Sequence, residues 1–395
     1  RIFTVIHLRA RGIASALGSW TEEKANQQEG SVVETNSHNC PPRKKMKTAF
    51  ISPFSNPSNS YIEIQKRILL ECGYQVRPLT LRTIFSPDLP TLLSRDSTLI
   101  FHWIENRCFS HGKNNPRFSL LGFLIWATYF LITKLSRGES VYFIHNHAVH
   151  DTTGINRTIS KMLISAFGSI CTKRATHSPP LAKFYRAHYL PHPLYWDSKT
   201  PTSEQCQGRQ DRSGPLHFGI IGAIRPYKGI DRIISNWPKG HHLKISGQCS
   251  EGYLNTLKNL VKQFDLEDSV TIDARFLSDA DLRQALDETD ALLLPHNPES
   301  SLVSGMFFEA IGKAPIIIAR PTPFIEWAAN QTKCVLLLSS DESLPDIVAQ
   351  ACALNEDSTG LESRAFALRE FGWNKCCERY KLFYRTEAIT RREHT

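Results

Sequence analysis

The chain has 395 residues and a formal net charge of +9. That length is too great for one hydrophobic core and suits two domains, and a hydrophobic share of 41% can fill both cores. The positive charge predicts an anionic partner, which could be nucleic acid, an anionic membrane face or a phosphorylated ligand. The ten cysteines include no CxxC pair, which argues against a zinc module or a disulfide framework and predicts a reduced, cytosolic compartment.

Residues 1–45 are polar and basic and have no clear periodicity after the first twenty. We predict a disordered or spurious N-terminal extension there, with the folded protein beginning near Met46, where a basic start feeds a first strand. A targeting segment is the alternative, since Arg1, Arg9 and Arg11 precede any acid. The segment lacks an uninterrupted apolar core and a small-residue cleavage site, which argues against that alternative.

From Met46 the pattern alternates between strand and helix, with strands predicted over 48–52, 76–79, 98–103 and 141–145. Ser60 with Glu63 has the spacing of a capping box, and Gly73 is placed to end the helix that follows. Such alternation favours parallel strands joined by crossover helices.

Residues 118–133 form the most apolar stretch of the chain. The stretch is slightly short for a membrane-spanning helix and contains Gly122, Thr128 and Tyr129. It is interpreted either as a helix packed on the sheet or as one that also dips into a membrane surface beside Arg117 and Lys134.

A linker is predicted over 197–214, where large apolar residues are almost absent. It separates a first domain, 46–196, from a second, 215–362, which repeats the alternation, and C-terminal helices follow over 363–395. The fold class is therefore α/β, with two doubly wound, Rossmann-like domains facing each other across a cleft.

The second domain begins with the apolar strand 216–221, which enters a turn from Gly222 to Gly229. Arg225 and Lys228 lie on this turn just before a helix, which is suited to binding an anion. An exposed pair of cations at a helix start is the alternative.

Two groups of residues, one of histidines and one of aspartates, could suggest a metal site, but their spacing supports it poorly. His145, His147 and His150 lack the helical histidine and carboxylate spacing of known sites. The aspartates after Ser278 have the spacing of a solvated helix face, at positions Asp279, Asp281, Asp287 and Asp290. The sequence has no GxGxxG followed by an acid, the motif that predicts an NAD site. It also has no P-loop, the motif that predicts an NTP site. We expect no metal and no cofactor.

Five elements follow one another in order between residues 215 and 330. They are the turn 222–229, Ile245-Ser246-Gly247, the strand 270–273, Asp290 to Pro295, and Glu309-Ala310 followed by Pro315 to Ala319. This order resembles the donor domain of GT-B fold glycosyltransferases of the family 4 type. The first domain resembles them more loosely, through Asn56-Pro57, His102-Trp103 and His145-Asn146-His147.

The resemblance implies a nucleotide-sugar donor as substrate and transfer without a metal and with retention of configuration. A leaving diphosphate needs fixed cations, and Arg225 and Lys228 would supply them. The implied catalytic residues are His145, Arg225, Lys228 and Glu309. The implied donor-binding residues are Gly222, Arg225, Lys228, Gly247, Pro295, His296, Glu299, Ser304, Gly305 and Glu309.

The sequence departs from the family pattern at two places. Ala223 stands where the family often has an arginine, so the charge falls to Arg225. The family's two glutamates lie eight apart, but Ser301 lies eight before Glu309, and Glu299 lies ten before it. Helix-cap or surface roles are the alternatives for the donor-site candidates Glu299, Ser304, Gly305 and Glu309.

His145 would face the reacting sugar, and a histidine satisfied within the fold is the alternative. Asn56, His102, Trp103 and His147 are expected on the acceptor side, and Trp103 could equally belong to the core. The C-terminal helices are expected to cross back onto the first domain, with packing on the second domain as the alternative.

Together these patterns predict a cytoplasmic glycosyltransferase, peripheral on the inner face of the plasma membrane, that acts on a glycan or lipid-linked acceptor in polysaccharide or glycoconjugate synthesis. Membrane contact would be made through 118–133. A GT-B nucleotide-sugar epimerase and a non-catalytic nucleotide- or sugar-binding subunit are the alternatives. Nucleic-acid binding is not expected, because no aromatic and basic surface motif accompanies the charge.

Overall fold

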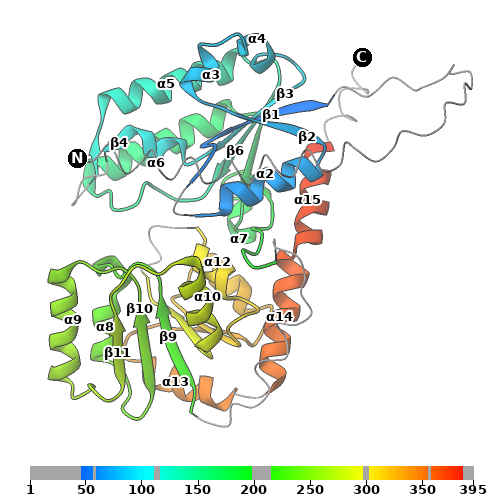
Figure 1. Ribbon diagram of the computed structural model, residues 1–395. Helices are drawn as coiled ribbons and strands as arrows, with labels where there is room; N and C mark the ends of the chain where they lie inside the picture. The colour runs from blue at the N-terminus through cyan, green and yellow to red at the C-terminus, as the bar shows by residue number, and fades with distance from the viewer. Residues whose placement is uncertain are drawn as a thin grey trace, which may run out of the picture. The chain divides into compact units, whose positions relative to one another are not determined.

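The computed structural model describes residues 46–56, 59–110, 116–197, 215–296, 302–354 and 357–385. Met46–Thr395 forms one compact unit. It contains two six-stranded sheets, one built from residues 47–189 and one from 217–337 (Figure 1). We call residues 46–197 the first lobe and residues 215–354 the second lobe. The predicted extension 1–45 and nearly all of the predicted linker lie outside the described residues.

The first sheet has the order β2-β1-β3-β6-β7-β8, and every neighbouring pair is parallel. Its strands are β1 (Lys47–Ser52), β2 (Tyr74–Pro78), β3 (Ser97–His102), β6 (Glu139–Ile144), β7 (Lys173–Thr176) and β8 (His188–Tyr189). The helices between them are α2 (Tyr61–Glu71), α3 (Leu81–Ile84), α4 (Leu89–Leu92), α5 (Leu120–Leu135), α6 (Gly154–Ile170) and α7 (Pro179–Ala182). A 3-10 turn, η1 (Ile104–Cys108), precedes the small antiparallel pair β4 (Phe109–Ser110) and β5 (Arg117–Phe118).

The central strands of this sheet are buried on both faces, as a parallel sheet between helices requires. Alternate side chains point to opposite faces, so Phe101 and Tyr142 pack with α5 and α6, whereas Ile100 and Phe143 pack with the α2 side. The expected alternation of strands and crossover helices is therefore confirmed.

Helix α2 does not begin with the expected capping box. The Ser60 side chain makes no capping hydrogen bond, because the backbone of Ser60 is already helical (φ −73°, ψ −2°). Asn59 caps the helix instead, and its Oδ1 accepts a hydrogen bond from the Tyr61 backbone N–H at 2.7 Å. Gly73 follows the helix at φ +84°, where a glycine is favoured, as expected from the sequence.

Helix α5 is the apolar stretch predicted over 118–133. Trp126, Tyr129 and Ile132 on one face are buried against the first sheet, while leucines on the opposite face are exposed. Among the described residues no helix combines the length and hydropathy that a bilayer crossing requires.

The second sheet is also fully parallel, with the order β11-β10-β9-β12-β13-β14. Its strands are β9 (His217–Ile221), β10 (His242–Ser246), β11 (Val270–Asp273), β12 (Ala291–Leu294), β13 (Ile316–Ala319) and β14 (Val335–Leu337). The helices between and after them are η3 (Pro226–Lys228), α8 (Ile230–Ser235), α9 (Glu251–Gln263), α10 (Asp279–Glu288), α11 (Gly305–Ala310), α12 (Pro323–Ala329) and α13 (Leu344–Ala353). Two parallel sheets with helices on their faces confirm the predicted fold class.

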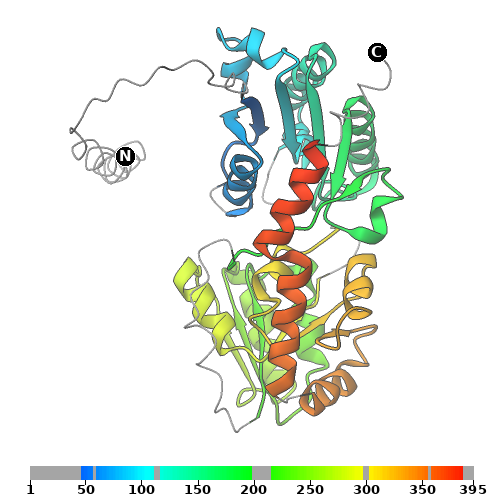
Figure 2. The same cartoon turned by 90° about the vertical axis from the view of Figure 1, so that its right-hand side faces the viewer.

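The last two helices connect the lobes. Helix α14 (Asp357–Phe371) packs beside β13, and α15 (Trp373–Arg385) packs beside α2, as Figure 2 shows in orange and red. Asp197 Oδ2 accepts a hydrogen bond from the Trp373 backbone N–H at 2.6 Å, at the point where α15 begins.

Buried polar groups hold α15 on the first lobe. Lys173 forms a buried ion pair with Glu139 and donates to the Phe383 carbonyl at 2.8 Å. Gln65 Nε2 donates to the hydroxyl of Tyr380 at 2.7 Å and lies 3.0 Å from the hydroxyl of Tyr61. Side chains from the end of the chain thus reach the interior of the first lobe.

Candidate functional site

A cavity of about 310 Å³ lies between the carboxyl ends of strands from both sheets. The volume is within the range of small-molecule sites. The first lobe contributes Asn59, Tyr61, Trp103, His145, Asn146, His150, His192 and Tyr195. The second lobe contributes Ile220, Ile221, Tyr227, Lys228, Leu293, Leu294, Pro295, His296, Val303, Ser304, Gly305 and Met306.

The turn after β9 is shaped by two glycines that approach each other. Gly222 has φ +105° and its N–H donates to the Ser246 carbonyl at 2.9 Å. Gly247, at φ +148°, packs so closely that a Cβ on it would lie 2.1 Å from the Gly222 carbonyl oxygen. Only glycine fits at 247, and the turn leaves Gly222 beside the Lys228 ammonium.

Lys228 supplies the positive charge of the cavity. Burial and the neighbouring charge of Arg225 lower the pKa of Lys228 to about 8. No carboxylate among the described residues forms an ion pair with it. A half-buried ammonium beside a second cation, without such a carboxylate, is a favourable place for an anion.

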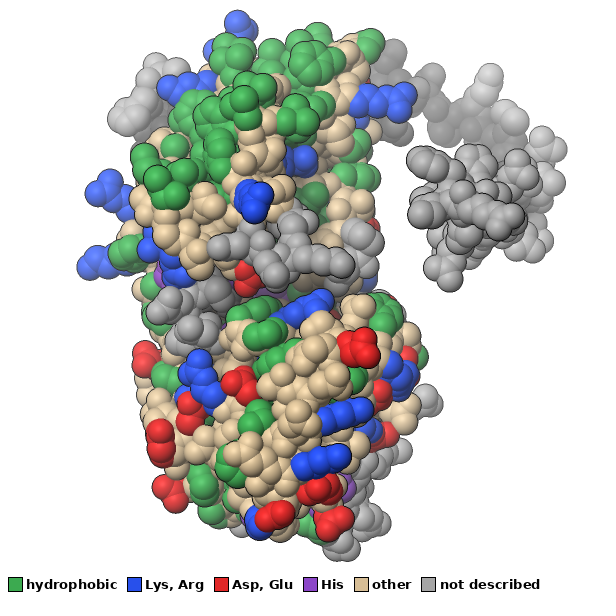
Figure 3. Space-filling model, turned by 90° about the vertical axis from the view of Figure 1, so that its left-hand side faces the viewer, with side chains coloured by type: hydrophobic (Ala, Val, Ile, Leu, Met, Phe, Trp, Pro, Cys, Tyr) green, Lys and Arg blue, Asp and Glu red, His purple; other side chains and the backbone are tan. Residues whose placement is uncertain are grey.

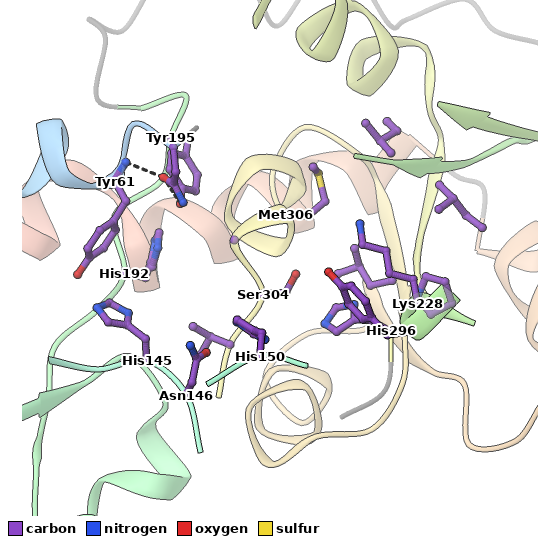
Figure 4. Close-up of a pocket in the computed structure, with 18 of the residues that line it drawn as sticks. Tyr61, His145, Asn146, His150, His192, Tyr195, Lys228, His296, Ser304 and Met306 are labelled. Atoms are coloured by element: carbon purple, nitrogen blue, oxygen red, sulfur yellow. Dashed lines mark hydrogen bonds between the residues drawn. The ribbon is translucent and has the colours of Figure 1, made fainter. Parts of the chain in front are cut away.

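His296 lies beside Lys228, on the same side of the cavity in Figure 4. Burial, then the charges of Lys228 and His150, lower its pKa to about 4. His296 is therefore neutral near pH 7 and can donate or accept a hydrogen bond. Ser304 lies between the two sides of the cavity, and its side chain makes no capping bond to α11.

His145 follows the end of β6 and faces the cavity from the opposite side (Figure 4). Its ring stacks on Trp103 with centroids 4.2 Å apart, and its backbone carbonyl accepts from the Leu302 N–H of the second lobe at 3.2 Å. Burial and the nearby histidines, His102 first, lower the pKa of His145. The imidazole is therefore neutral near pH 7 and is held in one orientation.

His102 lies behind His145 and fixes its hydrogen bonding. His102 Nδ1 and His145 Nε2 are 3.0 Å apart, and His102 Nε2 is buried without a partner among the described residues. A buried N–H without an acceptor is rarer than a buried acceptor without a donor. We therefore assign the proton to His102 Nδ1, which leaves His145 with its own proton on Nδ1.

Asn146 is a second polar group that faces the cavity. Its side chain is 4% exposed, and Nδ2 has no hydrogen-bond partner among the described residues. A buried amide donor without a partner costs about 1–3 kcal/mol, which an acceptor placed at this wall of the cavity would offset. Nearby, His192 stacks on Phe308 of the second lobe at 4.0 Å.

The residues expected from the sequence divide into three groups. Those that line the cavity are His145, Trp103, Lys228, Pro295, His296, Ser304 and Gly305. Those that adjoin it or lie apart from it are Gly222, Arg225, Gly247, His102, Asn56, His147 and Glu309. Glu299 lies outside the described residues.

The outlying residues have other neighbours. His147 Nδ1 lies 2.6 Å from the Tyr185 hydroxyl, and Asn56 accepts through its carbonyl from the Asn59 N–H at 3.3 Å. Glu309 is half-buried on α11 near Tyr195, whose pKa is raised first by burial and further by the Glu309 charge. The catalytic role of Glu309 and the acceptor roles of Asn56 and His147 stay predictions.

Several lining residues were not expected from the sequence. Tyr61, Tyr195 and His192 reach the cavity from a helix start and from the loop after β8, where no motif marks them. Asn146 and His150 lie in the histidine-rich segment after β6. That segment was the sequence feature that could have indicated their place at the cavity.

The described residues contain no group of three or more His, Cys, Asp and Glu arranged to hold a metal ion. Asp279 and Asp281 lie in the first turn of α10, where Ser278 and Asp281 form a capping box. Arg275 pairs with Asp281 at 2.9 Å, so this acidic cluster has a structural role.

No protein-family model matches the sequence, and neither does any curated protein. Solved structures are similar in fold. The Anabaena protein HepE, in complex with UDP and glucose, is 11% identical with a TM-score of 0.57, over 86% of this chain and 100% of its own. Sucrose-phosphate synthase from Thermosynechococcus elongatus is 13% identical with a TM-score of 0.60, over 88% and 100%.

AviGT4, a glycosyltransferase involved in avilamycin A biosynthesis, is 14% identical with a TM-score of 0.52, over 86% of this chain and 97% of its own. These matches extend over both sheets and the helices that cover them. The chain therefore has the GT-B fold of these glycosyltransferases, which confirms the fold predicted from the turn at Gly222 and the elements after it.

Proposed function

We propose that this protein is a glycosyltransferase that moves a sugar from a nucleotide-sugar donor to a hydroxyl of a glycan or lipid-linked acceptor. One observation carries the proposal: the same cavity is lined by the half-buried Lys228 on one side and by His145 and Asn146 on the other. A donor has the same two ends, a diphosphate and a sugar.

The diphosphate is the leaving group. As the bond from the sugar C1 to the phosphate oxygen breaks, negative charge grows on that oxygen, and Lys228 and Arg225 stabilise it. A new bond forms between C1 and the acceptor oxygen, and the acceptor proton passes to the departing phosphate. In this proposal the fixed cations do the work that a metal ion does elsewhere, and the configuration at C1 is retained.

The sugar lies toward His145. Neutral His145, with its proton on Nδ1, donates a hydrogen bond to a sugar hydroxyl, and Asn146 Nδ2 donates a second. Both groups lack another partner for these atoms among the described residues. The solved structure of HepE contains UDP and glucose, which makes UDP-glucose the first donor to test.

The experiment is a thermal-shift panel of UDP-, GDP-, ADP- and TDP-sugars, followed by transfer assays with the donor that binds. A ligand that binds only the native state raises the melting temperature. We expect Lys228→Ala and Arg225→Ala to abolish transfer while Lys258→Ala, on the exposed face of α9, leaves it unchanged. Unchanged transfer in both site variants would refute the site.

Product analysis separates the two alternatives. An epimerase releases a free sugar without any acceptor, and a non-catalytic subunit binds the nucleotide without hydrolysis or transfer. The anomeric configuration of the product, read by NMR, tests retention.

We also propose that the enzyme works in the cytoplasm at the inner face of the plasma membrane, in polysaccharide or glycoconjugate synthesis. Residues 118–133 would make the membrane contact. The exposed leucines of α5 support this part of the proposal.

A further inference from the structure

Helix α5 carries a row of leucines that faces solvent along its whole length. These leucines are 55–70% exposed and lie at Leu120, Leu121, Leu124, Leu131 and Leu135. At 100° per residue all five fall within about one quarter of the helix circumference. Soluble proteins expose single apolar side chains freely, but a contiguous row marks an interaction surface.

Helix α6 packs beside α5 and extends this surface. Its exposed side chains include Ile155, which is 76% exposed, and Met162, which is 65% exposed. The two residues are seven positions apart, so they lie about two turns apart along the same face of α6. Figure 3 shows hydrophobic side chains gathered over this lobe, with Lys and Arg around them. We call the exposed side chains of α5 and α6, together with Phe118 before α5, the α5–α6 face.

Most charges around the α5–α6 face are positive, although the exposed Asp151 lies just before α6. Between residues 106 and 196 the sequence has eleven Lys and Arg and two acids, Glu139 and Asp151. Glu139 is buried in its ion pair with Lys173. Arg117, Lys134 and Arg137 are exposed on or next to α5. A row of exposed leucines bordered by Lys and Arg fits a partner that has an anionic outer layer over an apolar interior.

We propose that the α5–α6 face docks on an anionic lipid bilayer, with α5 lying in the plane of the headgroups. This inference deepens the membrane contact of the proposed function, since it names the second helix, the cations and the lipid charge. Helix α5 has 16 residues and is about 24 Å long, short of the roughly 20 residues that a spanning helix needs. Its leucines insert on one side, and Trp126 and Tyr129 on the other stay in the core.

A second copy of the chain is a poorer occupant of this face. In a two-fold contact the same patch meets itself, which would bring the exposed cations of both copies together. A bilayer with anionic headgroups instead attracts each Lys or Arg by about 1 kcal/mol.

The position of the face suits an acceptor held in the membrane. Helix α6 begins at Gly154, nine residues after His145 in the cavity, and His150 lies between them and also lines the cavity. The docked lobe is therefore the one that contributes His145 and His150 to the cavity.

The test is sedimentation of the full chain with vesicles of phosphatidylglycerol and phosphatidylcholine in equal parts, against vesicles of phosphatidylcholine alone. We expect binding to the anionic vesicles to be at least roughly tenfold stronger and to weaken with salt. The double variant Leu124→Ser/Leu131→Ser should bind the anionic vesicles roughly tenfold or more weakly. The reason is that two leucine side chains are no longer transferred from water into the bilayer.

Matched controls keep the test specific. Leu361→Ser removes a leucine that is 71% exposed on α14, away from the face, and should bind as the wild type does. Lys134→Glu/Arg137→Glu should weaken binding to anionic vesicles, whereas Lys258→Glu should not. Melting temperatures close to wild type show that the exposed substitutions leave the fold intact.

Equal binding to both kinds of vesicle, or wild-type binding by the double leucine variant, would overturn the proposal. So would a dimer in lipid-free sedimentation that the leucine variant converts to monomer. Donor binding by thermal shift is measured on the same variants and should not change. A failure of docking is therefore distinguishable from a failure of the proposed sugar transfer.

Discussion

Replacing Lys228 by Met should change both the strength of donor binding and its dependence on pH. In the free protein burial and Arg225 hold the pKa of Lys228 near 8. A bound diphosphate favours the charged ammonium and raises that pKa again. Binding then takes up a proton whenever free Lys228 is neutral, so the affinity must fall as the pH rises through about 8.

The magnitude follows from the free pKa. At about pH 7 roughly nine-tenths of the free protein carries a charged Lys228, and at about pH 9 roughly one-tenth does. If the bound group stays charged across this window, the affinity for a nucleotide-sugar falls about tenfold, or about 1.4 kcal/mol. Tyr227 and Cys249 have raised pKa values and His296 titrates near pH 4, so the change belongs to Lys228.

The assay is isothermal titration with UDP-glucose, or with the donor that the thermal-shift panel identifies, at several pH values between about 7 and about 9. Lys228→Met should bind more weakly with a flat profile, and Lys228→Arg should also be flat because its charge does not titrate there. Lys258→Met should keep the wild-type slope. A wild-type affinity that is constant across this window would refute the reasoning.

Gly247→Ala should unfold at a lower temperature and lose donor affinity, because its Cβ would lie 2.1 Å from the Gly222 carbonyl oxygen; Gly252→Ala, with open space around it, is the control. His102→Phe keeps a ring beside Phe143 but removes the hydrogen bond to His145, so kcat should fall about tenfold with little change in donor affinity. Wild-type kcat in that variant would contradict the positioning role. Lys173→Met leaves Glu139 buried without its partner and should lower the free energy of unfolding by about 3–5 kcal/mol in urea denaturation.

Most of the fold could be predicted from the hydrophobic periodicity of the sequence. Buried parallel strands such as β9 and β12 are short apolar runs, followed by Gly222 and by Pro295, so the strands of both sheets could be predicted from local pattern. The start of α2 could not, because Ser60 and Asn59 are both good caps and only the backbone conformation at Ser60 decides between them.

The site was predictable where it lies on strand ends and less so elsewhere. His145 directly follows β6 and Lys228 lies on the turn after β9, and their place at the cavity was expected. Tyr61, His192 and Tyr195 were not, because they reach the cavity through long-range packing that local pattern does not encode. That Asn146 Nδ2 has no hydrogen-bond partner among the described residues could not be predicted either, because it depends on which side chains surround it in the folded chain.

The buried contacts of α15 have a consequence for the order in which the chain is made. Gln65 connects the cavity residue Tyr61 to Tyr380, and Lys173 reaches the Phe383 carbonyl, so the first lobe is completed by α15, which is translated after both sheets. The ribosome must therefore synthesise α15 before the interior of that lobe can be completed. Termination between Met306 and the start of α15 would therefore leave the sugar side of the site incomplete, although every residue lining the cavity had already been made.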